Sequence, residues 1–310
     1  MSTGSSGSTG SSGSSAASAR TEQAAGPTEP TALTGRARAD EIRAEVAQLA
    51  AELTQAGTQP RLAVVVATRD ESTAWYVRSI ARAAAKSGLA CDLVTLDADA
   101  EPAAIRGTLE RLSADPAVHG VILQTPLPEG AVAAELAAAL APDKDVDGAN
   151  PLSLGRLAAG LPAFPPATAE AVVQLLDAHG IPLAGRTVAV VGRSTVVGKP
   201  LAHLLLDRDA TVTVCHSRTA QLAAVTRQSD IVVAAAGRAG LITAGHVRQG
   251  AVVVDVGTNP TPEGGLTGDV DAASVAPKAA ALSPVPGGVG PLTTALLLRH
   301  TVLAAQGASA

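Results

Sequence analysis

Short apolar runs alternate with stretches of helical periodicity along most of the chain. Residues 61–67 form an unbroken run rich in β-branched side chains, whereas residues 40–53 repeat apolar side chains at helical spacing. Unbroken runs of this kind are typical of parallel strands that are covered on both faces. The alternation therefore predicts an α/β fold in which helices cover mostly parallel sheets.

This alternation falls into two blocks, each long enough for a domain. The first block predicts strands at 61–67, 91–96 and 120–124, and helices at 40–53, 73–87, 103–112 and 131–140. The second predicts strands at 188–191, 210–214, 231–235 and 252–256, and a helix at 169–178 joins the two blocks. We predict a first domain at 33–165 and a second, Rossmann-like domain at 166–290. Because ligands bind at the carboxyl ends of parallel strands, we expect the active site in the cleft between them.

The segment 186–206 is the strongest local signal in the sequence. A buried strand is followed by a loop that Gly192 and Gly198 bracket, and Pro200 suits the first turn of a helix. Free N–H groups and the positive end of the helix dipole make such a loop a phosphate site. Ser194 replaces the middle glycine of the common dinucleotide fingerprint. Taken alone, the loop is also compatible with an ordinary strand-to-helix turn that needs two glycines.

The end of the next strand favours one cofactor. An NAD enzyme places an Asp or Glu there for the ribose hydroxyl, but residues 215–219 contain no acid. Arg193, Ser217 and Arg218 instead offer cations and a hydroxyl, which are the groups that a 2′-phosphate requires. The sequence therefore predicts NADP.

Composition narrows the protein class. The first 31 residues are mostly Ser, Gly, Ala and Thr, so we interpret residues 1–32 as a disordered tail outside the domains. Two distant cysteines and a net charge of -5 argue against a disulfide scaffold and a nucleic-acid partner, and favour a reducing, cytoplasmic setting. No apolar run reaches the roughly 18 residues of a membrane span. The six histidines show no metal-ligand spacing, so we expect no metal and interpret each as structural or surface.

Three further segments place polar residues where a substrate could meet them. Tyr76 and Ile80 lie on one side of a predicted helix, four residues apart. Gln124 closes a buried strand, and Asp147 lies in the acidic turn 142–148. When they occur singly, residues of these types mostly cap turns and helices or pack against neighbouring side chains. Their joint occurrence is what indicates a site.

Together with Ser-Pro-Val-Pro-Gly-Gly-Val-Gly-Pro-Leu-Thr at 283–293, these segments make the chain closely resemble the methylenetetrahydrofolate dehydrogenase/cyclohydrolase family, the bacterial FolD-type enzymes. The resemblance extends over about residues 33–306. It implies oxidation of 5,10-methylenetetrahydrofolate to the 5,10-methenyl form with NADP, followed in most members by hydrolysis to 10-formyltetrahydrofolate. It also implies a homodimer, in which the last helix, 291–310, packs back on the first domain.

The resemblance assigns roles to individual residues. Tyr76 matches a tyrosine that lies against the folate, and Gln124 and Asp147 match a polar pair at the pterin and the reacting bridge. The matched folate-side loop runs from Pro286 to Thr294, and its predicted substrate-binding residues are Pro286, Gly287, Gly288, Val289, Gly290, Pro291 and Thr293. The matched cofactor positions are Gly192, Arg193, Ser194, Gly198, Ser217, Arg218 and Thr258.

One departure from the family pattern bears on chemistry. The position of the family's catalytic lysine holds Ile80, and Arg78 and Arg82 are about 200° round the helix on either side of it. Hydride transfer needs no proton movement, but hydrolysis does. We therefore expect a dehydrogenase with weak or absent cyclohydrolase activity. A bifunctional enzyme that recruits another group is the alternative, and a folate- or NADP-binding protein without turnover is a third hypothesis.

Overall fold

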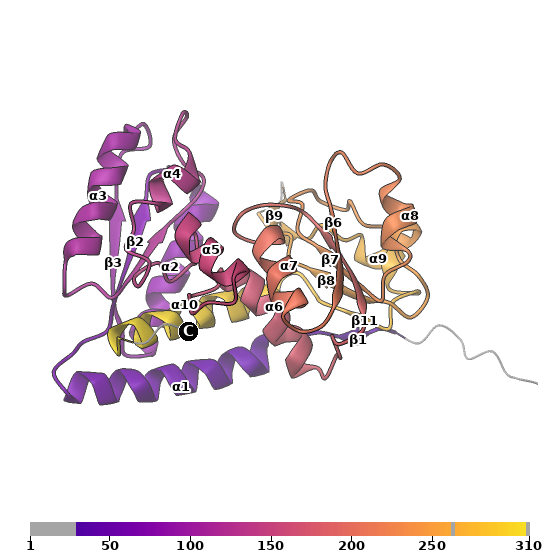
Figure 1. Cartoon of the computed structure of the whole chain (residues 1–310), viewed down its shortest axis with the longest axis horizontal. Coiled ribbons are helices and arrows are strands. Elements are labelled where there is room, and N and C mark those ends of the chain that lie inside the picture. Colours follow the sequence, from indigo (N-terminus) through magenta and orange to yellow (C-terminus); the bar gives the residue numbers. More distant parts are fainter. Residues whose placement is uncertain (1–28, 262–263, 308–310) are drawn as a thin grey trace, which may run out of the picture.

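The computed structural model describes residues 29–261 and 264–307 and has two α/β domains (Figure 1). Both contain a parallel sheet covered by helices, so the predicted fold class is confirmed. No helix in the described part of the chain is long and apolar enough to cross a membrane.

The first domain is built on a three-stranded sheet with the order β3-β2-β4. Its strands are β2 (Arg61–Val66), β3 (Ala90–Thr95) and β4 (Gly120–Leu123). The helices of this part of the chain are α1 (Arg36–Gln55), α2 (Glu71–Lys86), α3 (Pro102–Ala114), α4 (Ala133–Ala137) and α5 (Pro151–Ala158). The segment that follows α4 continues the sheet beyond β4, because Asp145 pairs with Val121 in a parallel bridge.

The second domain is built on a six-stranded sheet with the order β1-β11-β8-β7-β5-β6. Its strands are β1 (Thr31–Ala32), β5 (Thr187–Val191), β6 (Thr211–Cys215), β7 (Ile231–Ala234), β8 (Val252–Asp255) and β11 (Ala281–Leu282). The helices are α6 (Ala167–Ala178), α7 (Gly198–Leu206), α8 (Leu222–Thr226), α9 (Ala272–Val275) and the 3₁₀ turn η1 (Ala244–His246). A small hairpin, β9 (Asn259–Pro260) and β10 (Leu266–Thr267), follows β8.

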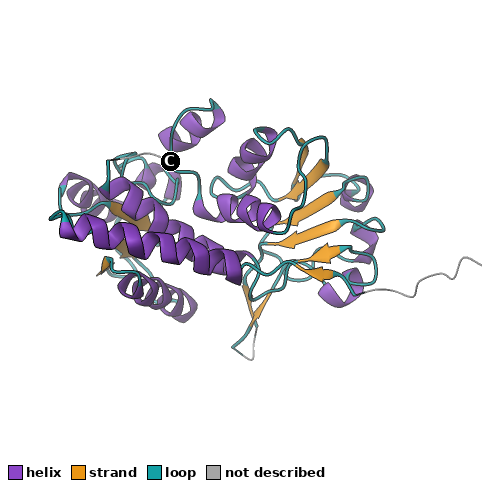
Figure 2. Cartoon of the chain, turned by 90° about the horizontal axis from the view of Figure 1, so that it is seen from below, coloured by secondary structure: helices purple, strands orange, loops and turns teal. Residues whose placement is uncertain are grey.

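The last helix, α10 (Val289–Ala305), returns to the first domain. It lies along α1 and also contacts α6, and Figures 1 and 2 show the long pair α1 and α10 side by side. Most of its side chains are buried, because α1, α2, α6 and strands β2 and β4 surround it. The helix begins two residues before the predicted position, and Pro291 lies in its first turn, where a missing N–H is tolerated.

Several expectations need correction. Thr31 and Ala32 form β1, paired with β11, so residues 31–32 do not belong to a disordered tail. Residues 1–28 lie outside the described part of the chain. The helix expected at 131–140 shrinks to Ala133–Ala137. The short elements α5, β11 and the β9-β10 hairpin were not expected, because segments of this length carry little periodic signal.

Candidate active site

The turn between β5 and α7 is closed by its two glycines. Gly192 has φ 141°, which favours glycine, and its N–H donates to the carbonyl of Cys215 at 2.9 Å. A Cβ built on Gly198 would lie 2.2 Å from the carbonyl oxygen of Gly192. Ser194 braces the turn, since its carbonyl accepts from Lys199 N at 3.0 Å and its Oγ accepts from Val197 N at 3.2 Å. The backbone of this loop therefore packs on itself too closely for any side chain at residue 198.

The predicted phosphate-binding side chains follow the ends of neighbouring strands. Val191 of β5 pairs with Cys215 of β6, so Arg193 and the pair Ser217 and Arg218 emerge at the same edge of the sheet. All three are exposed. Among the described residues neither arginine has a carboxylate within salt-bridge distance, so both guanidinium groups are available to an anion. This fits the phosphate of a 2′-phosphorylated dinucleotide. Thr258 is exposed after β8, which β7 separates from β5.

Three segments meet around Tyr76, the residue predicted to lie against the folate. Burial raises the pKa of the Tyr76 phenol well above its usual range, the charge of Asp147 raises it further, and a hydrogen bond with Thr294 opposes the rise. Helix α2 therefore meets both the turn after β4 and helix α10 at this phenol. The hydroxyl that contacts Tyr76 belongs to Thr294, whereas Thr293 is buried and donates to Val289 O at 3.5 Å.

Asp147 lies in a turn with unusual electrostatics. Burial and the charge of Asp145 raise its pKa to about 7, while the charge of His300 and a hydrogen bond from Ala167 N–H oppose the rise. The turn is tight, because Gly148 has φ 59° and a Cβ there would lie 2.5 Å from Pro166 N. A carboxyl group with this pKa exchanges its proton near neutral pH.

Gln124 lies at the same end of the sheet as Asp147. Its N–H donates to Val65 O at 2.9 Å, which continues the β2-β4 pairing by one residue, and its Nε2 donates to Thr125 O at 2.9 Å. The structure thus places Gln124 after β4, beside the segment that carries Asp147. No direct contact links their side chains in the described part of the molecule.

Ile80 faces the interior of the first domain. Its side chain has no exposed surface and belongs to the main apolar cluster, on which Tyr76 also packs. Arg78 and Arg82 are exposed. Among the described residues, no lysine or arginine is one of the charged groups that shift the pKa of Tyr76 or Asp147. Among the described residues, no lysine or arginine therefore takes the place of the missing lysine beside Tyr76 or Asp147.

The loop 284–288 connects β11 with α10. Val285-Pro286 is a cis peptide, Gly287 has φ 115°, and Gly288 N–H donates to Pro284 O at 2.9 Å. The start of α1 presses against this loop, since a Cβ on Gly35 would lie 2.1 Å from Gly288 O. A cavity of about 280 Å³ lies beside it.

The predicted members of this loop differ in exposure. Pro286 and Gly290 are exposed, Gly287 and Pro291 are partly buried, and Gly288 and Val289 are buried. Only part of the loop can therefore meet a ligand through its side chains.

Sequence reasoning missed three carboxylates that fix loops near the site. Asp145 accepts from Ala149 N, Asn150 N and Ser153 Oγ, and Asp255 accepts from the N–H groups of residues 257, 269 and 270. Asp269 accepts from the N–H groups of residues 236–238. The available signal was a nearby glycine, since Gly148, Gly257 and Gly268 each lie within three residues of one of them. In the described part of the chain no three His, Cys, Asp or Glu residues are grouped to hold a metal.

Comparison with known proteins covers both domains. Residues 33–147 match the tetrahydrofolate dehydrogenase/cyclohydrolase catalytic domain, and residues 166–309 match the NAD(P)-binding domain of the same family. The chain is 69% identical over 274 residues to Bifunctional protein FolD 1 of Saccharopolyspora erythraea, a match that covers 88% of this chain and 94% of that protein.

Two solved structures are similar over nearly the whole chain. The bifunctional enzyme FolD-methylenetetrahydrofolate dehydrogenase/cyclohydrolase from Campylobacter jejuni is 36% identical with a TM-score of 0.86, covering 89% of this chain and 99% of that one. The Trypanosoma brucei methylenetetrahydrofolate dehydrogenase-cyclohydrolase, complexed with NADP cofactor and inhibitor, is 36% identical with a TM-score of 0.85, covering 90% and 98%.

Proposed function

This chain belongs to the tetrahydrofolate dehydrogenase/cyclohydrolase family, and from that premise we propose that it oxidises 5,10-methylenetetrahydrofolate with NADP and hydrolyses the methenyl product to 10-formyltetrahydrofolate. The observation that carries the proposal is the meeting of Tyr76, Asp147 and Thr294 in one cluster, in a chain that also retains the glycine-closed cofactor loop.

The oxidation suits the residues that are present. NADP, when bound, supplies a nicotinamide that accepts the hydride. The protein then has to align the bridge carbon and stabilise the positive charge that spreads over two folate nitrogens. We assign the charge stabilisation to the carboxylate of Asp147, and the packing of the folate ring to Tyr76. Gln124 supplies a further polar contact at the same end of the sheet.

The choice of cofactor follows from the unpaired arginines. Arg193 and Arg218 have no acidic partner among the described residues, and the exposed Ser217 directly precedes Arg218. Two charge-assisted contacts to a phosphate are worth about 1.5–3 kcal/mol each, which is enough for a tenfold or larger preference for NADP over NAD.

The hydrolysis needs a group that moves protons, and Ile80 has none. Asp147 is the titratable carboxyl group on this face, and its pKa of about 7 suits it to act as both base and acid. In the proposed step, water attacks the methenyl carbon as its proton passes to the carboxylate. The carboxyl group then returns that proton to the ring nitrogen as the carbon–nitrogen bond breaks, and the hydroxyl proton leaves to solvent as the formyl carbonyl forms.

The second candidate is a dehydrogenase with slow hydrolysis. It is favoured by one observation, the fully buried isoleucine at the lysine position. The curated relative at 69% identity is named bifunctional, which favours the first candidate. A homodimer, implied by the family, remains part of the proposal and is testable by sedimentation.

One assay separates the candidates. Methylenetetrahydrofolate is mixed with the protein and NADP, and the methenyl absorbance is followed as it forms and then decays. A bifunctional enzyme accelerates both phases above the buffer blank. Formation with decay at the blank rate identifies the second candidate, and no formation of the methenyl product contradicts the proposed function altogether.

A further inference from the structure

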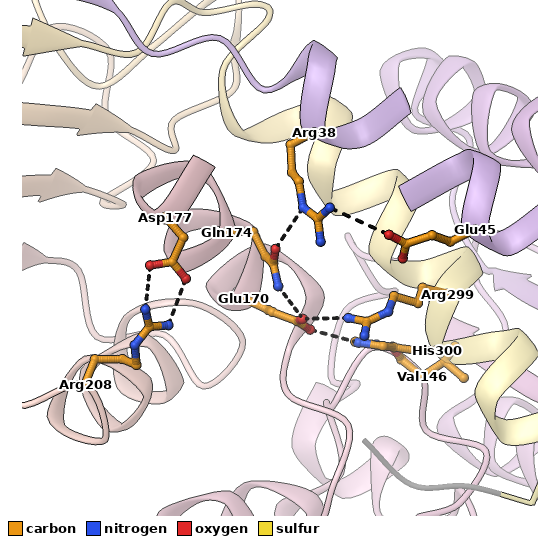
Figure 3. A network of polar contacts seen from close by, with 9 residues as sticks. All are labelled: Arg38, Glu45, Val146, Glu170, Gln174, Asp177, Arg208, Arg299 and His300. Carbon is orange, nitrogen blue, oxygen red and sulfur yellow. Dashed lines mark hydrogen bonds and ion pairs between the residues drawn. The ribbon is translucent and has the colours of Figure 1, made fainter. Parts of the chain in front are cut away.

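A buried histidine from the last helix joins two acceptors next to Asp147. His300 is 1% exposed, and its Nδ1 lies 2.8 Å from the carbonyl oxygen of Val146 while its Nε2 lies 2.9 Å from Oε2 of Glu170 (Figure 3). The contacts span 154 and 130 positions of the sequence. Phe164 packs against the imidazole, with 5.0 Å between the ring centroids.

Both partners of this imidazole are hydrogen-bond acceptors. A backbone carbonyl only accepts, so Nδ1 must carry a hydrogen. Glu170 is ionised, because its hydrogen bond and ion pair with His300, aided by Arg299 and Gln174, outweigh the effect of burial and lower its pKa. An ionised carboxylate also only accepts, so Nε2 carries a hydrogen as well. In this arrangement both ring nitrogens donate, and the charge of His300 lowers the pKa of Asp147.

The position of this cation matters for the site. The carbonyl oxygen that His300 binds belongs to the peptide group that joins Val146 to Asp147, so the contact fixes the turn immediately before the carboxylate. The other charged or titratable groups facing Asp147 are Asp145 from its own segment and Tyr76 from α2. Lys144 turns away, since its Nζ donates to Asp115 O at 2.6 Å. Among the described residues, the cation that faces Asp147 is therefore His300.

Glu170 is itself held in place. Arg299 lies 3.6 Å from its Oε1, and Gln174 donates to the same oxygen at 3.5 Å (Figure 3). Arg38 of α1 donates to Gln174 at 3.3 Å. Glu170 and His300 thus belong to a network that links α6 and α10 to α1. This network keeps the His300 ring aligned with the Val146 carbonyl.

We propose that His300 and Glu170 are positioning residues, which hold the Asp147 carboxylate ionised and aligned to stabilise the cation formed in the oxidation. The inference rests on the proposed function and deepens it, because it assigns a role to two residues outside the substrate-contacting set. Asp147 would act on the substrate, His300 on Asp147, and Glu170 on His300. Because the three residues act in series, the effects of substituting His300 and Glu170 are not expected to add.

The direction of the expected change in the pH–rate profile follows from the charges around Asp147. The oxidation requires ionised Asp147, so its rate rises with pH through the Asp147 pKa, which is about 7. Removing a neighbouring cation disfavours the ionised carboxylate, so the midpoint of the pH–rate profile moves to higher pH, by about one unit. The rate then falls about fivefold at pH 7 and hardly changes at pH 9, a pattern that general loss of structure does not produce.

The test uses His300→Gln and Glu170→Gln in the full chain. The hydride step is followed in single turnovers by NADPH fluorescence from pH 5.5 to 9.5, with the melting temperature of each variant as the fold check. Both variants should move the midpoint upward by about one unit, and the double variant should move it no further than His300→Gln alone. Asp147→Asn should abolish the acid limb of the profile.

A matched control lies on the same helix. Asp177 of α6 forms a bidentate pair with Arg208, at 2.8 and 2.5 Å, on the side away from His300 (Figure 3). Asp177→Asn should leave the midpoint unchanged. Unmoved midpoints in both folded test variants, or additive shifts in the double variant, would overturn the inference. If the unmodified protein does not oxidise the substrate, the proposed function fails, and ¹³C NMR titration of the Asp147 carboxyl in the same variants decides the inference separately.

Discussion

The cofactor loop and the folate-side cluster are built in different ways. The cofactor loop is defined by backbone, since Gly192 and Gly198 approach each other so closely that no side chain fits at residue 198. The folate-side cluster is defined by side chains from α2, α10 and the turn after β4. In the second, Ile80 stands where the family resemblance expects a lysine, and its side chain is fully buried. A site made of backbone tolerates little change, whereas a site made of side chains can change a residue and keep its packing.

The substitution expected to have the largest effect is Gly198→Ala, in the loop that is defined by backbone. The added Cβ would meet the Gly192 carbonyl, which is backbone and cannot swing away, so the loop must open. Overpacking of this kind costs about 1–3 kcal/mol, and we expect NADP affinity to fall roughly 100-fold. Isothermal titration with NADP measures it. Gly245→Ala is the control, because its Cβ would lie 3.7 Å from the nearest atom, and equal affinities in the two variants would contradict the close-packing argument.

The second prediction restores the missing group on the other side. Ile80→Lys should raise methenyl hydrolysis relative to oxidation at least tenfold, because a positioned acid–base group is worth about 10²–10⁴-fold. It should also lower the melting temperature, since the side chain replaced has no exposed surface. Ile80→Met keeps the volume without the amine and serves as the control. Rapid hydrolysis in the unmodified protein, with no gain in Ile80→Lys, would contradict this prediction. It would show that Asp147 supplies all of the acid–base catalysis that the lysine would otherwise provide.

The third prediction concerns the side chains that we expect to contact the cofactor. These side chains can change without altering the backbone of the cofactor loop. Arg193→Ala should reduce the preference for NADP over NAD about tenfold, with kcat/KM for NAD nearly unchanged, because only the 2′-phosphate loses a partner. Initial rates with both cofactors test it. Arg227→Ala, an exposed arginine at the end of α8, is the control and should keep the preference.

The smallest effect is expected at the N-terminus. A chain starting at Leu33 loses β1 and its hydrogen bond from Thr31 N to Ala280 O, and with it about 1–2 kcal/mol. For a protein of this size the melting temperature should drop by roughly 2–6 °C. A chain starting at Glu29 keeps β1 and isolates the contribution of residues 1–28. Identical melting curves for both truncations would show that β1 adds nothing to the sheet.

The sequence predicted the elements that local pattern determines. Strands β2, β5 and β7 are continuous apolar runs with flanking turns, and each lies within one residue of its predicted position. The cofactor loop was predictable for the same reason, because glycine positions within a short segment carry its geometry. Family membership was predictable from three motifs, and the matches to both domains confirm it.

What the sequence did not predict depends on distant partners. Strand β1 is two residues long and exists only because β11 lies beside it. His300 was interpreted as an ordinary structural or surface residue, since its acceptors, Val146 and Glu170, are more than a hundred positions away. The hydrogen bond between Thr294 and Tyr76 depends on the rotation of α10, which is buried nearly all round and so carries little periodic signal.

The path of the chain between the domains bears on how the protein is made. Strand β1 precedes α1 in sequence but lies in the second sheet, and α10 follows β11 yet completes the first domain's core. During synthesis, α1 and β2 leave the ribosome long before the helix that covers them. The first domain therefore waits with exposed apolar surface until the second has been translated, a state in which chaperones recognise nascent chains. The folate-side cluster, which includes Thr294, is complete only when the last helix docks.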